Sequence, residues 1–199
     1  HALAMMLCLT KQIAQVNMAL RRDPELDRFA FRNNDIFGKT LGIVGLGEIG
    51  TRVAEVCSTA FKMPVLTTHP RLTAEEAAKR HAELVSFAEL LERSDFVLVA
   101  CGLNDETRGM FGAAEFAAMK PNAYFVTIGR GGIHDEEALA AALAGHAALD
   151  QRHDRRHAVH PLSDARRAGL AQARSPLQAV QRLPPLSADA RLLPHVPHP

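Results

Sequence analysis

Short apolar runs alternate with amphipathic stretches along the first three quarters of the chain. Residues 41–44, 65–68, 96–100 and 123–128 are four such runs, each of strand length. Between the first two, Ile49, Val53 and Val56 recur at helical spacing. Continuous apolar strands that alternate with helices are typical of a parallel sheet covered on both faces. The predicted fold class is therefore α/β, a doubly wound parallel sheet.

The flanking patterns place the remaining elements. Residues 1–22 carry a broad apolar face and predict one long helix that Asp23-Pro24 ends. Thr73-x-x-Glu76 and Ser86-x-x-Glu89 are capping boxes that begin two short helices, with a brief edge strand over 82–85 between them. Residues 135–144 predict a further helix, with Gly145 as its C-cap.

A glycine-rich turn follows the first apolar run directly. Gly45-x-Gly47-x-x-Gly50 separates that strand from the helix that begins near Glu48 and Ile49. In a dinucleotide-binding turn the first glycine permits the tight bend, the second lets the backbone approach a pyrophosphate, and the third lets helix and strand pack closely. The free N–H groups of the helix then face the phosphates. A glycine-rich surface turn is the alternative, and the strand-turn-helix order favours nucleotide binding.

Composition changes near residue 147. The last 53 residues contain eight Arg and seven Pro but no Glu, Lys, Ile or Phe. Without β-branched or aromatic bulk this segment is not expected to close a core, although short helical patches such as 164–173 are plausible. We therefore expect an irregular tail over 147–199, and a hypothesis follows that it is an out-of-frame or artificial continuation.

Charge and cysteine content limit the partners. The net charge is +1, but residues 1–146 carry −3, which argues against a nucleic-acid partner. No apolar run is long enough to span a membrane. The three cysteines are odd in number and scattered, which suggests a reducing compartment and a cytoplasmic location. The chain begins without Met, so we expect any true N-terminus and targeting signal to lie outside it.

Six motifs in register resemble the D-isomer-specific 2-hydroxyacid dehydrogenases, the family that includes D-3-phosphoglycerate dehydrogenase. They are HALAMML, GKTLGIVGLGEIG, FAELLERSDFVLV, NDETRGMF, MKPNAYFV and IGRGGIHDEEAL. The resemblance implies an interdomain helix over 1–22, a Rossmann-type dinucleotide-binding domain over 23–146, and a substrate domain that mostly lies upstream. It also implies hydride transfer between a nicotinamide and the C2 of a 2-hydroxy or 2-keto acid, and a homodimer paired through this domain.

The resemblance places Arg130 at the arginine that holds the substrate carboxylate. A guanidinium gives a bidentate, permanently charged fork for such a group. From the residues alone, an ion pair between Arg130 and a neighbouring acid such as Asp135 is an equal alternative.

The resemblance also implies the residues that hold the cofactor. The second strand should end in an acid for the adenosine ribose, but His69 stands there, followed by Pro70 and Arg71. Without the carboxylate a 2′-phosphate is not repelled and Arg71 is able to pair with it, so NADP is credible beside NAD, the family's usual cofactor. The full candidate set is Gly45, Gly47, Glu48, Ile49, Gly50, His69, Pro70, Arg71, Cys101, Gly102, Leu103, Thr107, Ile128, Gly129 and Asp150.

The resemblance also implies a histidine that acts as general acid and base and a glutamate that orients it, a few tens of residues after Arg130. Neither has a match in this chain. Ala147-Ala-Leu-Asp150 echoes the start of the expected segment, but nothing after Asp150 follows it. Pro194-His195 mimics the expected pair too far downstream, and we interpret it as coincidence. His153, His157 and His160 have a spacing seen in metal sites, but no Cys or carboxylate pattern supports one, so no metal is predicted.

We therefore expect an NAD(P)-dependent oxidoreductase present as its cofactor domain, and a fragment that does not turn over. A non-catalytic, nucleotide-sensing interaction protein on the same fold, as in the family's corepressor branch, is the alternative. A non-functional gene remnant is a third interpretation.

Overall fold

A computed structural model describes residues 1–23, 25, 31 and 34–153, with the backbone alone for 145–153. The chain divides into two compact units, residues 1–158 and 159–199, and the second lies outside the described residues. The predicted patch at 164–173 therefore also lies outside them.

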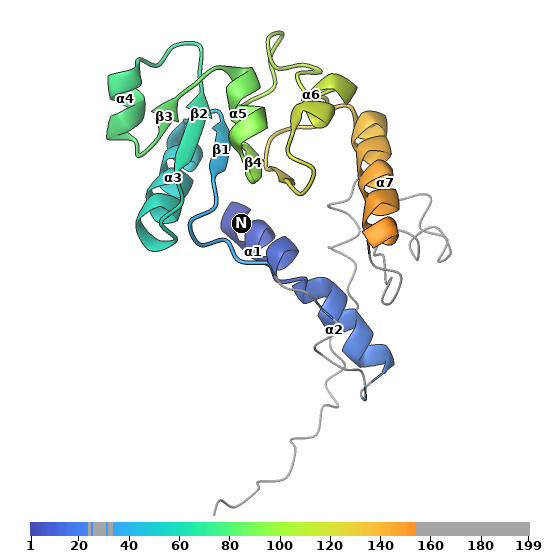
Figure 1. The fold of residues 1–199 in the computed structure, drawn as a ribbon. Coiled ribbons are helices and arrows are strands. Elements are labelled where there is room, and N and C mark those ends of the chain that lie inside the picture. Colours follow the sequence, from blue (N-terminus) through green and yellow to red (C-terminus); the bar gives the residue numbers. More distant parts are fainter. Residues whose placement is uncertain (24, 26–30, 32–33, 154–199) are drawn as a thin grey trace, which may run out of the picture. The chain divides into compact units, whose positions relative to one another are not determined.

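Five parallel strands form the sheet at the centre of the first unit (Figure 1). The strands are β1 (Leu41–Val44), β2 (Val65–Thr68), β3 (Glu83–Leu84), β4 (Phe96–Val99) and β5 (Tyr124–Thr127). Their order is β3-β2-β1-β4-β5, and every pairing is parallel. The chain first builds outward from β1 to the β3 edge and then crosses back to β4. The predicted doubly wound fold is confirmed, and the direction of winding reverses between β1 and β4.

Helices cover both faces of the sheet. The helices of the described chain are α1 (Ala2–Thr10), α2 (Ile13–Arg22), α3 (Glu48–Ala60), α4 (Ala74–Lys79), α5 (Phe87–Arg93), α6 (Ala113–Ala118) and α7 (Glu136–His153), and of these α2 buries no residue. Side chains alternate along each strand, so β1 directs Leu41 and Ile43 to one face and Val44 to the other. The first face packs against α1 and α3, and the second packs against α5, α6 and α7. Figure 1 shows α5, α6 and α7 following one another along that second side.

Both predicted capping boxes are present. The Thr73 hydroxyl accepts the Glu76 N–H at 3.2 Å, and the Glu76 carboxylate accepts the Thr73 N–H at 2.8 Å. Ser86 and Glu89 make the same pair of bonds at the start of α5. These bonds satisfy N–H groups that a helix start otherwise leaves free. They also hold the pKa of Glu76 below its usual value, since hydrogen bonds to the carboxylate favour its charged form.

The predicted single helix over 1–22 is wrong, because the chain forms two helices bent by 54° at Lys11-Gln12. The Thr10 hydroxyl donates back to the Met6 carbonyl at 2.6 Å, and the Thr10 carbonyl accepts the Asn34 N–H at 3.1 Å. Gln12 then takes a left-handed conformation with φ 49°. The hydrogen bond from the Asn34 N–H thus replaces the bond that the Thr10 carbonyl would accept, in a continuous helix, from the N–H four residues later. Within the described residues, no single helix is long and apolar enough to cross a membrane; only the bent pair α1–α2 reaches that length together.

The predicted C-cap at Gly145 is also wrong. Helix α7 continues through Gly145 and is described as far as His153. A glycine inside a helix costs about 1 kcal/mol relative to alanine, and the surrounding Ala and Leu are strong helix formers. The helix propensity of these neighbours therefore outweighs the single glycine, and α7 runs past residue 146. The domain division proposed there stays a prediction.

Asp95 links the starts of three strands. Its carboxylate accepts the Thr40 N–H at 2.8 Å and the Lys120 ammonium at 3.0 Å. Its main chain bonds to Thr40 before β1 and to Tyr124 at the start of β5. Burial opposes ionisation of this carboxyl, but the Thr40 amide and the Lys120 ammonium outweigh it, so the pKa of Asp95 lies below its ordinary value.

Replacing Asp95 by alanine is expected to lower the free energy of unfolding by about 1–3 kcal/mol at neutral pH, because charge-assisted bonds are lost. A carboxyl with a depressed folded pKa stabilises above its unfolded pKa, and that stabilisation is lost as the pH falls through the folded value. Urea unfolding at pH 7 and pH 3 should therefore show a smaller difference at pH 3. Asp105→Ala, which removes an exposed loop acid, is the control. A pH-independent difference would contradict this account.

Candidate functional site

The glycine turn brings the end of β1 against the end of β4. Gly45 has φ +98°, a conformation that other residues rarely adopt, and a Cβ there would lie 2.7 Å from the Cys101 main-chain nitrogen. A Cβ on Gly50 would overlap the Gly45 carbonyl oxygen. The positive φ of Gly45 agrees with the tight turn that the sequence predicts there, and the overlap at Gly50 agrees with the close helix packing predicted for that glycine.

Gly47 differs because it faces open space. A Cβ at Gly47 would meet no atom within 4 Å, so packing does not require a glycine here. Gly47 is the N-cap of α3 and provides no side-chain cap. The first N–H groups of α3, at Glu48 and Ile49, therefore have neither an intrahelical nor a capping partner. Their unbalanced dipoles make this exposed helix start suited to an anion.

Segments after three neighbouring strands meet beside this turn. Gly45 follows β1, Cys101 follows β4 and Gly129 follows β5, and a Cβ on Gly129 would lie 3.1 Å from the Cys101 carbonyl oxygen. Cys101 is half-buried, and burial raises the pKa of its thiol, which stays protonated at neutral pH. Ile128 packs into the core on the α1 and α3 face. These candidate residues lie at the carboxyl edge of the sheet, where its winding reverses.

The loop after Cys101 is held by Thr107. The buried Thr107 hydroxyl donates to the Gly102 carbonyl at 2.8 Å and accepts the Asn104 N–H at the same distance. Leu103 packs against the second core cluster, and Gly102 is exposed with open space around it. Thr107 therefore shapes the loop that presents Gly102, and its hydroxyl is already engaged within that loop.

His69 at the end of β2 takes the place of the expected acid. Its Nδ1 accepts the Arg71 N–H at 3.1 Å, which leaves Nε2 as the protonated nitrogen of the neutral ring. Pro70 and Arg71 are exposed. The imidazole thus fixes the bend that begins at residue 69 and leaves the Arg71 side chain at the surface.

Arg130 is exposed in the loop after β5, just beyond the carboxyl edge of the sheet. Asp135 uses its carboxylate to accept the N–H groups of Glu137 and Ala138 at the start of α7. Across the described part of the chain, no ion pair joins Arg130 to Asp135. The alternative in which Arg130 serves to bind that acid has no support in the structure, and its role toward a substrate stays a prediction.

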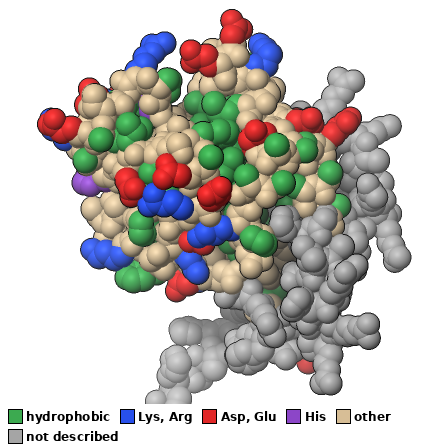
Figure 2. All heavy atoms as spheres, turned by 45° about the horizontal axis from the view of Figure 1, so that its top comes forward, with side chains coloured by type: hydrophobic (Ala, Val, Ile, Leu, Met, Phe, Trp, Pro, Cys, Tyr) green, Lys and Arg blue, Asp and Glu red, His purple; other side chains and the backbone are tan. Residues whose placement is uncertain are grey.

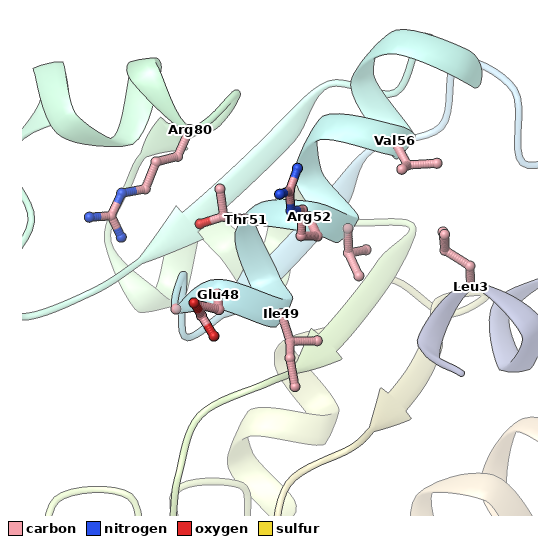
Figure 3. A pocket seen from close by; sticks show the side chains of 9 residues that line it. Leu3, Glu48, Ile49, Thr51, Arg52, Val56 and Arg80 are labelled. Atoms are coloured by element: carbon pink, nitrogen blue, oxygen red, sulfur yellow. The ribbon is translucent and has the colours of Figure 1, made fainter.

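An open hollow of about 800 Å³ lies beside the start of α3 (Figure 3). Gly47, Glu48 and Thr51 line it together with two arginines, Arg52 and Arg80. Arg80 donates from Nη1 to the Leu46 carbonyl inside the glycine turn at 2.8 Å. Sequence reasoning missed Arg80, because no motif connects it to a turn 34 residues earlier.

On the face in Figure 2, acidic and basic side chains are interspersed with apolar ones.

Two predicted features fall partly or wholly outside the description. Asp150 lies within α7, in the part for which only the backbone is described. His157 and His160 are also outside the described residues. In the part of the chain that the structure describes, no group of three His, Cys, Asp or Glu side chains could hold a metal ion.

The family follows from comparison with known proteins. Residues 3–170 match the family model for the D-isomer specific 2-hydroxyacid dehydrogenase, NAD binding domain. The chain belongs to this family. The match continues past residue 146 and so includes the whole described part of α7.

Relatives and solved structures agree with this assignment. The chain is 41% identical over 147 residues to D-3-phosphoglycerate dehydrogenase of Mycobacterium leprae, covering 73% of this chain and 28% of that protein. It is 45% identical over 109 residues to glyoxylate/hydroxypyruvate reductase B of Shigella boydii, and the match covers 55% of this chain and 34% of that protein. Aquifex aeolicus D-lactate dehydrogenase, solved with NAD and lactic acid, superposes with a TM-score of 0.67 at 27% identity. This match covers 73% of this chain and 43% of that protein. The chain thus spans under a third of the first relative's length.

The residues present fit a dinucleotide such as NAD. The open space at Gly47 leaves room for a pyrophosphate against the backbone, and the uncapped start of α3 offers N–H donors to it. The close approach of Gly45 to Cys101 places the adjoining loops at the same edge. This domain of the family binds NAD, and the local geometry agrees with that use.

Gly47→Val tests this site directly. Because nothing lies within 4 Å of the added Cβ, the variant should fold, with a melting temperature lowered by a few degrees at most because valine is a poorer N-cap than glycine. The new side chain would occupy the space for the pyrophosphate, so calorimetry should show ADP-ribose binding weakened at least about tenfold. Gly131→Val is the matched control, since Gly131 is equally open but follows β5. Unchanged ADP-ribose affinity in Gly47→Val would exclude the turn as the binding site.

Proposed function

We propose that this chain is the cofactor-binding part of an NAD-dependent oxidoreductase that transfers a hydride to or from the C2 of a 2-hydroxy or 2-keto acid. The observation that carries the proposal is the glycine turn: two glycines packed against the protein and a third open to solvent at an uncapped helix start. Membership in the dehydrogenase family supports the reaction class. Three free thiols and the named metabolic relatives support a cytoplasmic location.

Each part of the site has a separate task in this proposal. Gly47 and the start of α3 hold the pyrophosphate, and the loops after β4 and β5 border the nicotinamide half. The bound nicotinamide supplies or takes up the hydride. Arg130 holds the substrate carboxylate through its guanidinium fork, which keeps its charge at any physiological pH. Its exposure, with no ion pair to Asp135, leaves the guanidinium available for this contact.

Of the three catalytic residues that the family resemblance implies, this chain matches the arginine alone. We therefore infer that this chain, by itself, binds the dinucleotide without turning over a substrate. Proton transfer at the C2 oxygen needs a positioned acid or base, and the sequence has no match to the family's glutamate and histidine. The substrate itself is a carboxylate of the 2-hydroxy or 2-keto class, because Arg130 is matched to that group.

Titration of the chain with NADH and, in parallel, NADPH tests the proposed function. We expect saturable NADH binding by calorimetry, and no loss of absorbance at 340 nm when glyoxylate, hydroxypyruvate or pyruvate is added. Preference for NADPH that Arg71→Ala abolishes would instead assign a 2′-phosphate contact to the exposed Arg71. Absence of binding by either dinucleotide would overturn the proposed function.

A homodimer belongs to the same proposal. Helix α1 buries Ala2 and Met6 against the sheet, whereas α2 has no buried residue. Ile13 and Leu20 on α2 are 50% and 39% exposed, and they lie seven residues apart on one side of the helix. Leu9 at the end of α1 is 39% exposed as well. A second copy of the chain would remove this apolar surface from water.

We expect the double variant Ile13→Glu/Leu20→Glu to be monomeric, because charge on a buried apolar contact opposes association. Light scattering coupled to gel filtration should show the unaltered chain at twice the monomer mass. Ala14→Glu, an exposed change on the same helix, should keep the dimer. A monomeric unaltered chain would refute the dimer.

A further inference from the structure

A charged side chain outside the glycine turn bonds to the turn's main chain. Arg80 follows α4 and donates from Nη1 to the Leu46 carbonyl at 2.8 Å. Leu46 is the residue between the first two glycines of the turn, and its own side chain is fully buried. The Thr51 hydroxyl also approaches this carbonyl, at a longer 3.4 Å. Arg80 is therefore the closer and charged donor.

The peptide plane connects this bond to the binding surface. In a trans peptide group the carbonyl and the following N–H lie in one plane and point in opposite directions. The Leu46 carbonyl and the Gly47 N–H share that plane. A donor that fixes the direction of the Leu46 carbonyl therefore also fixes the direction of the Gly47 N–H. The orientation of the next peptide, which carries the Glu48 N–H, depends on the same plane.

Arg80 is well placed for this task because its own main chain is anchored. Its N–H donates to the Ala77 carbonyl at 2.9 Å, and the capping box at Thr73 and Glu76 fixes the other end of α4. Ala77 and Ala82 on either side of Arg80 are buried. No carboxylate forms an ion pair with its guanidinium within the described ranges. Figure 3 shows Arg80 on the far side of the hollow from Leu3.

We propose that Arg80 is a positioning residue for phosphate binding, acting through the Leu46 carbonyl to orient the N–H groups of the glycine turn. The inference rests on the proposed function, since it concerns the same dinucleotide. A turn whose donors are oriented before binding loses less freedom on binding, so Arg80 raises affinity for the pyrophosphate without touching it.

Arg80→Met and Arg52→Met form a matched pair for the test. Both remove one positive charge from the same hollow, but Arg52 pairs with Glu55 one turn along α3 and makes no bond to the glycine turn. Calorimetry with ADP-ribose should show about tenfold weaker binding for Arg80→Met and less than threefold weaker binding for Arg52→Met. Arg80→Lys, which keeps a charged donor, should recover part of the loss. Adenosine, which lacks phosphate, should bind both Met variants as it binds the unaltered chain.

A second measurement separates positioning from direct contact. Without ligand, the amide ¹H–¹⁵N signal of Gly47 should shift in Arg80→Met and stay in place in Arg52→Met, while melting temperatures agree within about 2 °C. Equal ADP-ribose affinity in both variants would overturn the proposal. So would a loss confined to 2′-phospho-ADP-ribose, which would make Arg80 a ligand contact. If the unaltered chain bound no ADP-ribose, both the proposed function and the role of Arg80 would fail. If the unaltered chain and Arg80→Met bound ADP-ribose equally well, only the positioning role of Arg80 would fail.

Discussion

The close approach of β1 to the segment after β4 is the constraint on which the site depends. Gly45 has no Cβ, and any Cβ there would press on the Cys101 backbone. The same turn must deliver the chain into α3, where Gly50 packs on the Gly45 carbonyl. Once both contacts are satisfied, the start of α3 can only face outward at the carboxyl edge of the sheet. An exposed, uncapped helix start, which is suited to an anion, is thus a geometric consequence of packing two strands and a helix.

Much of this arrangement could be predicted from the sequence because its causes are local. The Gly45-x-Gly47-x-x-Gly50 spacing, the run at 41–44 and the two capping boxes each concern fewer than ten consecutive residues, and each was found where predicted. The strand over 65–68 has the predicted bounds for the same reason, since an apolar run ends at His69-Pro70.

The errors arise where distant residues decide the conformation. The 1–22 pattern is continuous in apolar periodicity, but the Asn34 N–H takes the Thr10 carbonyl and bends the helix pair. Gly145 has the local signature of a helix end, yet the helix continues through it. Arg80 has no local signature at all, because its importance comes from a carbonyl 34 residues earlier. Spacing rules cannot show a bond between side chain and main chain across two structural elements.

The groups suited to the dinucleotide differ in kind from the group expected to hold the substrate. The groups suited to the dinucleotide are mainly backbone N–H donors, and their positions are set by glycines and by the register of β1 with β4. The substrate contact, in contrast, is expected from one exposed guanidinium at Arg130. The dinucleotide contacts depend on the backbone path that Gly45 and Gly50 allow, whereas the expected substrate contact depends on one charged side chain. The glutamate and histidine that the family resemblance implies have no match in the sequence, and neither belongs to the turn that is proposed to bind the dinucleotide. Binding and turnover are physically separable in this fold, because they rest on different atoms.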